Sequence, residues 1–209
     1  MMSMEVILVK KSKSKVMENK EEKKRKILDV SFDLFKEKGF KDTTIQDIVD
    51  RAGIAKGTFY LYFKDKYDLQ DYLITKKSEQ LFKEAIEYVN KKNIEDFEER
   101  FISIIDYLID DFVNDKQLLM LISKDLSLGV FGDRLSSFVD NKVSIGILEE
   151  FEKIIKDNNI PIKNPKITLY MVIELTSSVV FTSIILNEPL PINELKPYLY
   201  EKIKKILLD

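Results

Sequence analysis

Residues 43–66 read TTIQDIVDRAGIAKGTFYLYFKDK, and this stretch predicts two short helices joined by a tight turn. Apolar residues recur at helical spacing through its first half: Ile45, Ile48, Val49 and Ala52. Thr44 is followed three residues later by Asp47, which has the form of a capping box. Thr43 with Gln46 offers the same pattern one residue earlier. The first helix therefore has a start that is marked in the sequence.

The turn and the second helix have a different character. Gly53 suits a positive φ just past a helix end, and Phe59 and Phe63 stand four residues apart on one face of the next helix. The other side carries small residues with cations and tyrosines around them: Lys56, Gly57, Thr58, Tyr60, Leu61, Tyr62, Lys64 and Lys66. This pattern is typical of a helix-turn-helix whose second helix enters a major groove. A hairpin packed inside a bundle is the alternative, although it would not need the polar face.

A larger set of residues extends the pattern in both directions: Ile27, Phe35, Gly39-Phe40, Thr43-Thr44, Ile48, Ala52-Gly53, Lys56 to Tyr60, and Phe63 to Lys66. In this order and spacing they resemble the DNA-binding domain of the TetR family of one-component transcriptional regulators, over about residues 20–73. Two positions depart from the family pattern. Ser31 stands where alanine is usual, and Leu61 stands where an aromatic or polar group is common.

The resemblance implies a role for each matching residue of the helix-turn-helix. It assigns base edges to Gln46, Gly57, Thr58 and Leu61. It assigns phosphate contacts to Thr44, Lys56, Tyr60, Tyr62 and Lys66. It also implies a cytoplasmic homodimer that presents residues 56–62 of each protomer to successive major grooves of a near-palindromic double-stranded operator. A small molecule bound in the C-terminal domain would favour a state with the wrong half-site spacing, so that the repressor leaves the DNA.

The distribution of charge agrees with a nucleic-acid-binding N-terminal part. Residues 1–66 hold 16 Lys and Arg against 11 Asp and Glu, whereas the remainder holds 18 against 25. A solvated basic helix would give the same imbalance, so charge alone does not decide.

Composition excludes several classes of site. The chain has no cysteine and no histidine, so a disulfide framework, a zinc site of the usual kind and a Ser-His-Asp hydrolase are excluded. The paired carboxylates Glu98-Glu99, Asp110-Asp111 and Glu149-Glu150 are adjacent in helical stretches and so face different directions. We therefore expect no enzyme activity and no cofactor.

Three parts are expected along the chain: a mobile basic arm (1–18), the helix-turn-helix domain (19–66) and a helical regulatory and dimerisation domain (67–209). The arm contains Lys10, Lys11, Lys13 and Lys15, which could lie along a phosphate backbone or in a minor groove. Met17 is an alternative start of the protein. A helix over about residues 19–38 should end at Gly39 and complete the three-helix domain.

The protein as a whole is expected to be all-α, with about nine helices, because no strand-like alternation occurs. Asp65 is expected to cap a helix that runs to about Asn90, and Asn93 to cap the next one. Further helices are expected at about residues 117–126, 135–158, 167–186 and 193–208. Residues 167–186 approach the length of a membrane span, but they contain Glu174 and six Ser or Thr residues. We therefore expect a helix buried against its own domain and a second subunit, without a membrane.

The resemblance further implies that the last two helices form the dimer interface and that the body holds a cavity for a largely apolar effector. Candidate residues for this ligand site are Phe101, Ile104, Tyr107, Leu108, Tyr170 and Glu174. Each aromatic residue could equally be ordinary core, and Glu174 could equally meet a structural partner. Two other functions remain open: a DNA-binding regulator controlled by a protein partner, and a helical carrier or enzyme that uses the hairpin only for packing.

Overall fold

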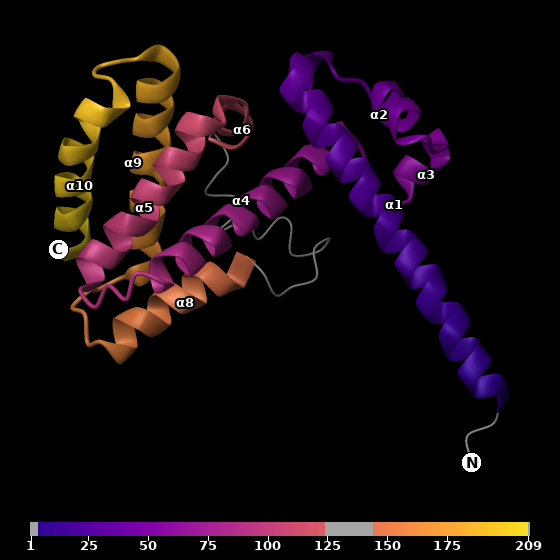
Figure 1. The fold of residues 1–209 in the computed structure, drawn as a ribbon, viewed down its shortest axis with the longest axis horizontal. Helices are drawn as coiled ribbons and strands as arrows, with labels where there is room; N and C mark the ends of the chain where they lie inside the picture. The colour runs from indigo at the N-terminus through magenta and orange to yellow at the C-terminus, as the bar shows by residue number, and fades with distance from the viewer. Residues whose placement is uncertain (1–3, 124–143, 209) are drawn as a thin grey trace. The chain divides into compact units, whose positions relative to one another are not determined.

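The computed structural model describes residues 4–123 and 144–208, with side chains from residue 19 to 123 and from 147 to 208. Every regular element in these ranges is helical, which confirms the predicted all-α class (Figure 1). The elements are α1 (Met4–Asp42), α2 (Ile45–Ala52), α3 (Lys56–Tyr60), α4 (Lys66–Asn90), α5 (Phe97–Asn114), α6 (Lys116–Ile122), α8 (Ser144–Asp157), α9 (Pro165–Phe181), the π-helical turn η2 (Thr182–Leu186) and α10 (Ile192–Leu208). The chain forms two compact units, Met1–Gln70 and Asp71–Asp209, and α4 runs from one into the other.

Helix α1 differs from the expectation at its start. The helix begins at Met4, inside the segment that was expected to be an arm, rather than near residue 19. The predicted break at Gly39 is present, because this residue has φ 83° and interrupts the helical backbone before a last turn that ends at Asp42. Glycine adopts this conformation at little cost. Beyond the break, the buried Thr43 hydroxyl donates to the Gly39 carbonyl at 2.8 Å and fixes the bend.

The first unit is built around one apolar core. Its members come from α1, α2, α3, the turn after α3 and the start of α4, and each is at most 6% exposed: Ile27, Leu34, Phe35, Ile48, Val49, Ala52, Phe59, Phe63 and Leu69. Asp65 caps α4 as predicted, since its Oδ1 accepts the backbone N–H groups of Tyr67 at 2.8 Å and Asp68 at 2.9 Å. The three-helix arrangement that the sequence predicts is therefore present.

In the second unit, the N-cap of α5 differs from the predicted one. The N-cap of α5 is Asp96, whose Oδ1 accepts the N–H of Glu99 at 2.8 Å, whereas Asn93 has φ 51° and lies in the turn that follows α4. The prediction for Asn93 was wrong because asparagine suits both helix caps and left-handed turns. Asp115 caps α6 in the same way as Asp96. The end of the helix predicted at 117–126 and the first part of the one predicted at 135–158 lie outside the described residues.

The last helices combine a buried and an exposed apolar side. Residues Pro165–Leu186 are long and apolar enough to cross a membrane by length and composition alone, a test that core helices of soluble proteins also pass. A third of that stretch is buried within the chain. In α10, Leu195, Leu199, Ile203 and Leu207 are buried. The Lys196 ammonium joins α10 to α5 by donating to Asp106 at 2.7 Å and Asp110 at 2.5 Å.

Candidate nucleic-acid interface

The start of α2 is held by the predicted capping box. The Thr44 hydroxyl accepts the backbone N–H of Asp47 at 3.1 Å, and Asp47 Oδ2 accepts the N–H of Thr44 at 2.7 Å and its hydroxyl at 2.6 Å. The Lys38 ammonium, 2.8 Å away, and these Thr44 donors hold the pKa of Asp47 well below its usual range. Both hydrogen-bond donors of Thr44 are therefore used within the domain.

The turn between α2 and α3 has the predicted geometry. Gly53 has φ 62° and ψ 41°, in the left-handed region. The next residue, Ile54, donates its N–H to the Val49 carbonyl at 3.0 Å, which closes the end of α2. Ile54 is half-buried in the angle between the helices. The Arg51 guanidinium braces α2 against α1 through two hydrogen bonds to Glu37, at 2.5 and 2.7 Å.

Helix α3 is shorter than predicted. It spans Lys56–Tyr60, because the N–H of Leu61 bonds to Thr58 and that of Tyr62 bonds to Phe59, in turns tighter than the α-helical pattern. Phe59 is 0% exposed and Phe63 is 3% exposed, so the apolar face is anchored as expected. Tyr62 therefore lies just past the helix rather than in it.

The opposite face of α3 is open to solvent. Leu61 is 76% exposed and Tyr60 is 51% exposed, while Lys56 and Gly57 are exposed and Thr58 and Tyr62 are half-buried. A Cβ atom added to Gly57 would meet nothing within 4 Å, and its φ lies outside the left-handed region. The fold of the protein alone therefore does not require glycine there. Gln46, on α2, is also exposed, and its Nε2 donates to Asp50 Oδ1 at 2.8 Å.

Lys66 differs from the other predicted phosphate ligands. Its ammonium donates to the backbone carbonyls of Phe40 and Thr43 at 2.7 Å each and to that of Lys41 at 3.3 Å. The same nitrogen lies 4.3 Å from the centre of the Phe40 ring. Lys66 thus joins the first residue of α4 to the end of α1 and the start of α2. Its cation neutralises carbonyl groups that a helix end leaves unpaired.

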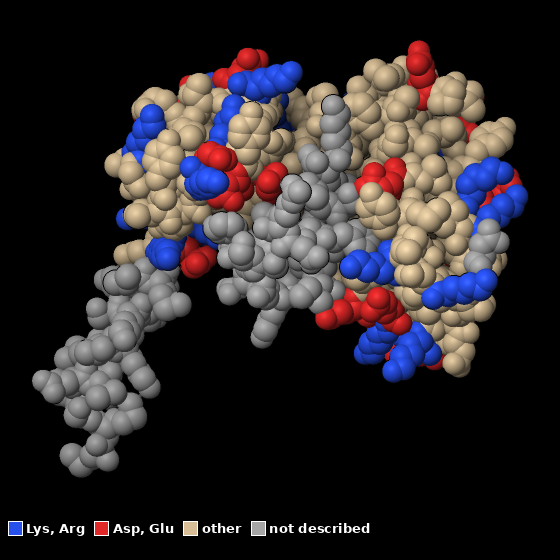
Figure 2. Space-filling view, turned by 180° about the vertical axis from the view of Figure 1, so that it is seen from behind, with Lys and Arg blue, Asp and Glu red and all other residues tan. Residues whose placement is uncertain are grey.

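Surface charge is mixed outside these contacts. Figure 2 shows cationic and anionic side chains interspersed over both units on the face that it presents. The described cations of the first unit therefore do not form one uniform patch on that face, and the candidate interface depends on local geometry.

The second unit holds a small apolar cavity among α4, α5, α8 and α9. Its volume is about 70 Å³. Three rings meet at its wall, with centroids 5.6 to 6.3 Å apart: Phe97, Phe101 and Phe151. A more open groove of about 540 Å³ between α4 and α8 shares Ile86, Ile147 and Glu150 with the cavity. Among the described residues, no group of three or more Asp or Glu side chains is placed to hold a metal ion.

Two of the six predicted ligand residues line this cavity, namely Phe101 and Ile104. Tyr107 instead packs its ring 4.8 Å from that of Tyr88, and Leu108 is buried core. Tyr170 is 47% exposed on α9, and Glu174 is half-buried there. Sequence reasoning missed Phe97 and Phe151 as cavity residues, although the four-residue spacing of Phe97 and Phe101 was a usable signal.

Comparisons with known proteins agree with this geometry. The model of the family described as bacterial regulatory proteins, tetR family, matches residues 27–73. The HTH-type transcriptional regulator YerO of Bacillus subtilis is 56% identical over 45 residues, which are 22% of this chain and 16% of YerO. The fatty acid metabolism regulator protein of the same organism is 33% identical over 76 residues, 36% of this chain and 39% of that protein. The chain thus spans less than half the length of these relatives.

Solved structures show the same fold over most of the chain. The regulator FadR from Bacillus subtilis, solved in complex with stearoyl-CoA, matches with a TM-score of 0.60 and 21% identity, and the match covers 88% of this chain and 97% of that one. A TetR-family regulator from Streptomyces coelicolor matches with a TM-score of 0.62 and 16% identity, over 90% and 97% of the two chains. The family match places residues 27–73 with the bacterial regulatory proteins of the tetR family, and the solved structures share the helical fold over most of the chain.

Proposed function

We propose that this protein is a dimeric DNA-binding transcriptional regulator, most simply a repressor, that a small molecule releases from a near-palindromic operator. The observation that carries the proposal is the α2–α3 pair. On the side of this pair that faces the core, Phe59 and Phe63 are buried, while Lys56, Gly57 and Tyr60 are exposed to solvent. Helix α3 is too short to be stable without that packing. Such a helix is suited to present side chains to a major groove.

Within this proposal, we divide the predicted DNA-contacting residues into those that contact DNA and those that position the helices. Gln46, Gly57, Thr58 and Leu61 would approach base edges, and Lys56, Tyr60 and Tyr62 would contact phosphates. Thr44 and Lys66 already use their hydrogen-bond donors inside the domain, so we assign them to positioning α2 and α4. Phosphate contact by either would first require an internal bond to break.

The proposed DNA binding is tested by fluorescence anisotropy with a duplex selected from random DNA by the protein itself. Because each phosphate contact releases counterions, log K should fall linearly with log salt, with a slope of about −0.9 per contact. Tyr62→Phe removes one hydroxyl and should weaken binding by about fivefold, since a lost hydrogen bond costs roughly 1 kcal/mol. A wild-type protein without salt-dependent DNA affinity would favour the carrier or enzyme alternative.

Dimerisation through α9 and α10 is supported by apolar side chains that the chain itself leaves open. Ile167 is 54% exposed, Met171 50% and Tyr198 61%. An exposed set of this kind is typical of an interface with a second subunit. Sedimentation equilibrium should show a dimer, and Met171→Glu should shift the population to monomer. A monomeric wild-type protein would contradict the proposed pairing of half-sites.

The proposed effector is largely apolar and enters the α4–α8 groove and the adjoining cavity. The cavity alone is smaller than usual ligand sites of about 300–1,000 Å³, so the groove must contribute. The related FadR structure contains stearoyl-CoA. Titration with stearoyl-CoA and with hydrocarbon-matched neutral compounds, followed by DNA release, tests this site. Release that persists in Phe101→Trp, which fills the cavity, would mean that the ligand binds elsewhere. No release of DNA by any of these compounds would favour control by a protein partner.

A further inference from the structure

Helix α1 projects beyond the core that it covers. Its inward face carries Ile27, Ser31, Leu34 and Phe35, all at most 6% exposed. Figure 1 shows the helix continuing well past α2 and α3 towards its N-terminus. Positions three, four and seven residues before Ile27 lie on the same helical face as that residue. In this protein those positions are Lys24, Lys23 and Lys20.

The inward face of α1 therefore changes from apolar to cationic where the core ends. Lys24 marks its direction, because the ammonium lies 6.0 Å from the centre of the Phe63 ring. Glu21 and Glu22 are one and two residues from Lys20 and so project to other sides of the helix. The lysine and glutamate side chains therefore project from different sides of this part of α1.

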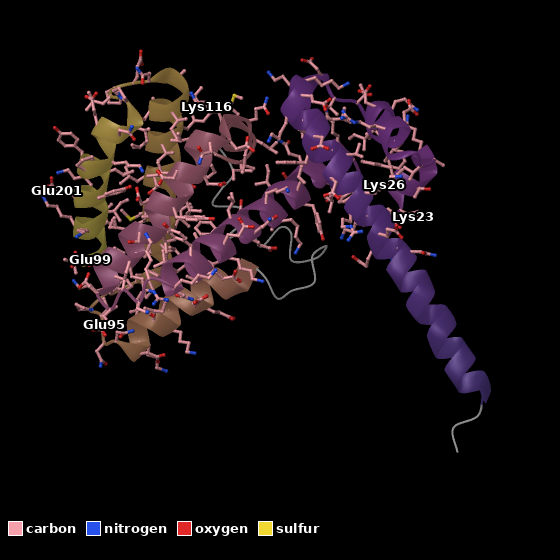
Figure 3. All side chains as sticks on the ribbon, viewed as in Figure 1. Lys23, Lys26, Glu95, Glu99, Lys116 and Glu201 are labelled. Carbon is pink, nitrogen blue, oxygen red and sulfur yellow. The ribbon has the colours of Figure 1, made fainter. Side chains whose placement is uncertain are left out.

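Lys20, Lys23 and Lys26, three residues apart, form a stripe that we call the α1 lysine surface. All three are exposed, and within the described side chains no ion pair joins any of them to a carboxylate. The stripe leads to the α2–α3 turn, since the Lys26 ammonium lies 3.9 Å from the position of a Cβ on Gly53. Figure 3 labels Lys26 and Lys23 close together along α1.

We propose that the α1 lysine surface binds the sugar–phosphate backbone of the operator outside the segment that α3 contacts. The inference rests on the proposed DNA binding and extends it to a second, sequence-independent contact. Three exposed cations aligned on the side of α1 that faces the helix-turn-helix match the charge of a phosphate strand. An anionic membrane or an acidic protein would match the sign of the charge, but not its continuity with the turn that begins α3.

The test uses the full-length double variant Lys20→Gln/Lys23→Gln, which removes two charges without touching the core. Against a long duplex, affinity should fall by about five- to tenfold at 0.1 M salt, and the salt slope should become less steep by about 1.8, or 0.9 per phosphate. Lys20→Arg/Lys23→Arg should retain both. The matched control Lys116→Gln/Lys163→Gln removes two exposed lysines of the second unit and should change neither.

In a second experiment, the duplex is shortened to the bases that α3 contacts. Wild-type affinity should then fall to that of the variant, while the variant should lose nothing further. An unchanged slope in the double variant, or the same loss on long and short duplexes, would overturn the α1 lysine surface while leaving the proposed function intact. Absence of salt-dependent binding in the wild-type protein would remove both proposals.

Discussion

Gly57→Ala should stabilise the protein and weaken its binding to DNA. The glycine lies in α3 with helical hydrogen bonding around it, and a methyl group there meets nothing within 4 Å. Replacing glycine by alanine in a helix contributes about 0.5–1 kcal/mol to stability, because the unfolded chain loses conformational freedom. If α3 enters the major groove, the same methyl group occupies space that a base edge needs. We expect affinity for the selected duplex to fall by roughly 10–100-fold, the value of one good base contact.

Opposite changes in stability and affinity make this variant informative. Urea denaturation followed by circular dichroism should show a higher midpoint, and fluorescence anisotropy should show the loss of specific binding with little change in salt slope. Glu152→Ala, at an exposed position of α8, is a control in which stability can change without any effect on DNA. Equal affinity of Gly57→Ala and wild-type protein would show that DNA does not approach α3 at this residue.

Features set by neighbours in sequence could be predicted from sequence. The capping box of Thr44 and Asp47, the cap at Asp65 and the positive φ of Gly39 and Gly53 each depend on contacts within a few residues. Local hydrogen bonding decides these features, so a short sequence window contains the information. The same reasoning predicted the wrong N-cap of α5 at Asn93, because the alternative cap, Asp96, is only three residues away.

Features set by distant residues could not be predicted. Lys66 was assigned to phosphate from the family resemblance, but its carbonyl partners lie 23 to 26 residues earlier. Likewise, Tyr107 and Leu108 were named as ligand candidates, but the sequence did not show that Phe97, Phe101 and Phe151 meet at the cavity. Periodicity identifies the buried side of a helix, and packing between helices decides which buried residues surround a void.

Lys66→Met should reduce DNA affinity without removing a phosphate contact. Methionine fills similar space, but it cannot donate to the carbonyls of Phe40, Lys41 and Thr43. Hydrogen bonds from a charged group contribute roughly 1.5–3 kcal/mol, so we expect the first unit to lose about 2–3 kcal/mol of stability. The end of α1 and the start of α4 would then move independently, and α3 would be less well positioned. Affinity should fall by at least about tenfold at a temperature where the variant retains the wild-type circular dichroism.

The salt slope separates this positioning role from a direct contact. Lys56→Met, which removes an exposed cation at the start of α3, should make the slope less steep by about 0.9 and leave stability nearly unchanged. Lys66→Met should do the reverse, with lower stability and an unchanged slope. Lys66→Arg should recover part of the affinity, since a guanidinium can still donate to the carbonyl groups. A reduced slope together with wild-type stability in Lys66→Met would mean that the ammonium leaves its carbonyl partners on binding and contacts phosphate instead, because only a group that neutralises DNA charge changes the number of counterions released.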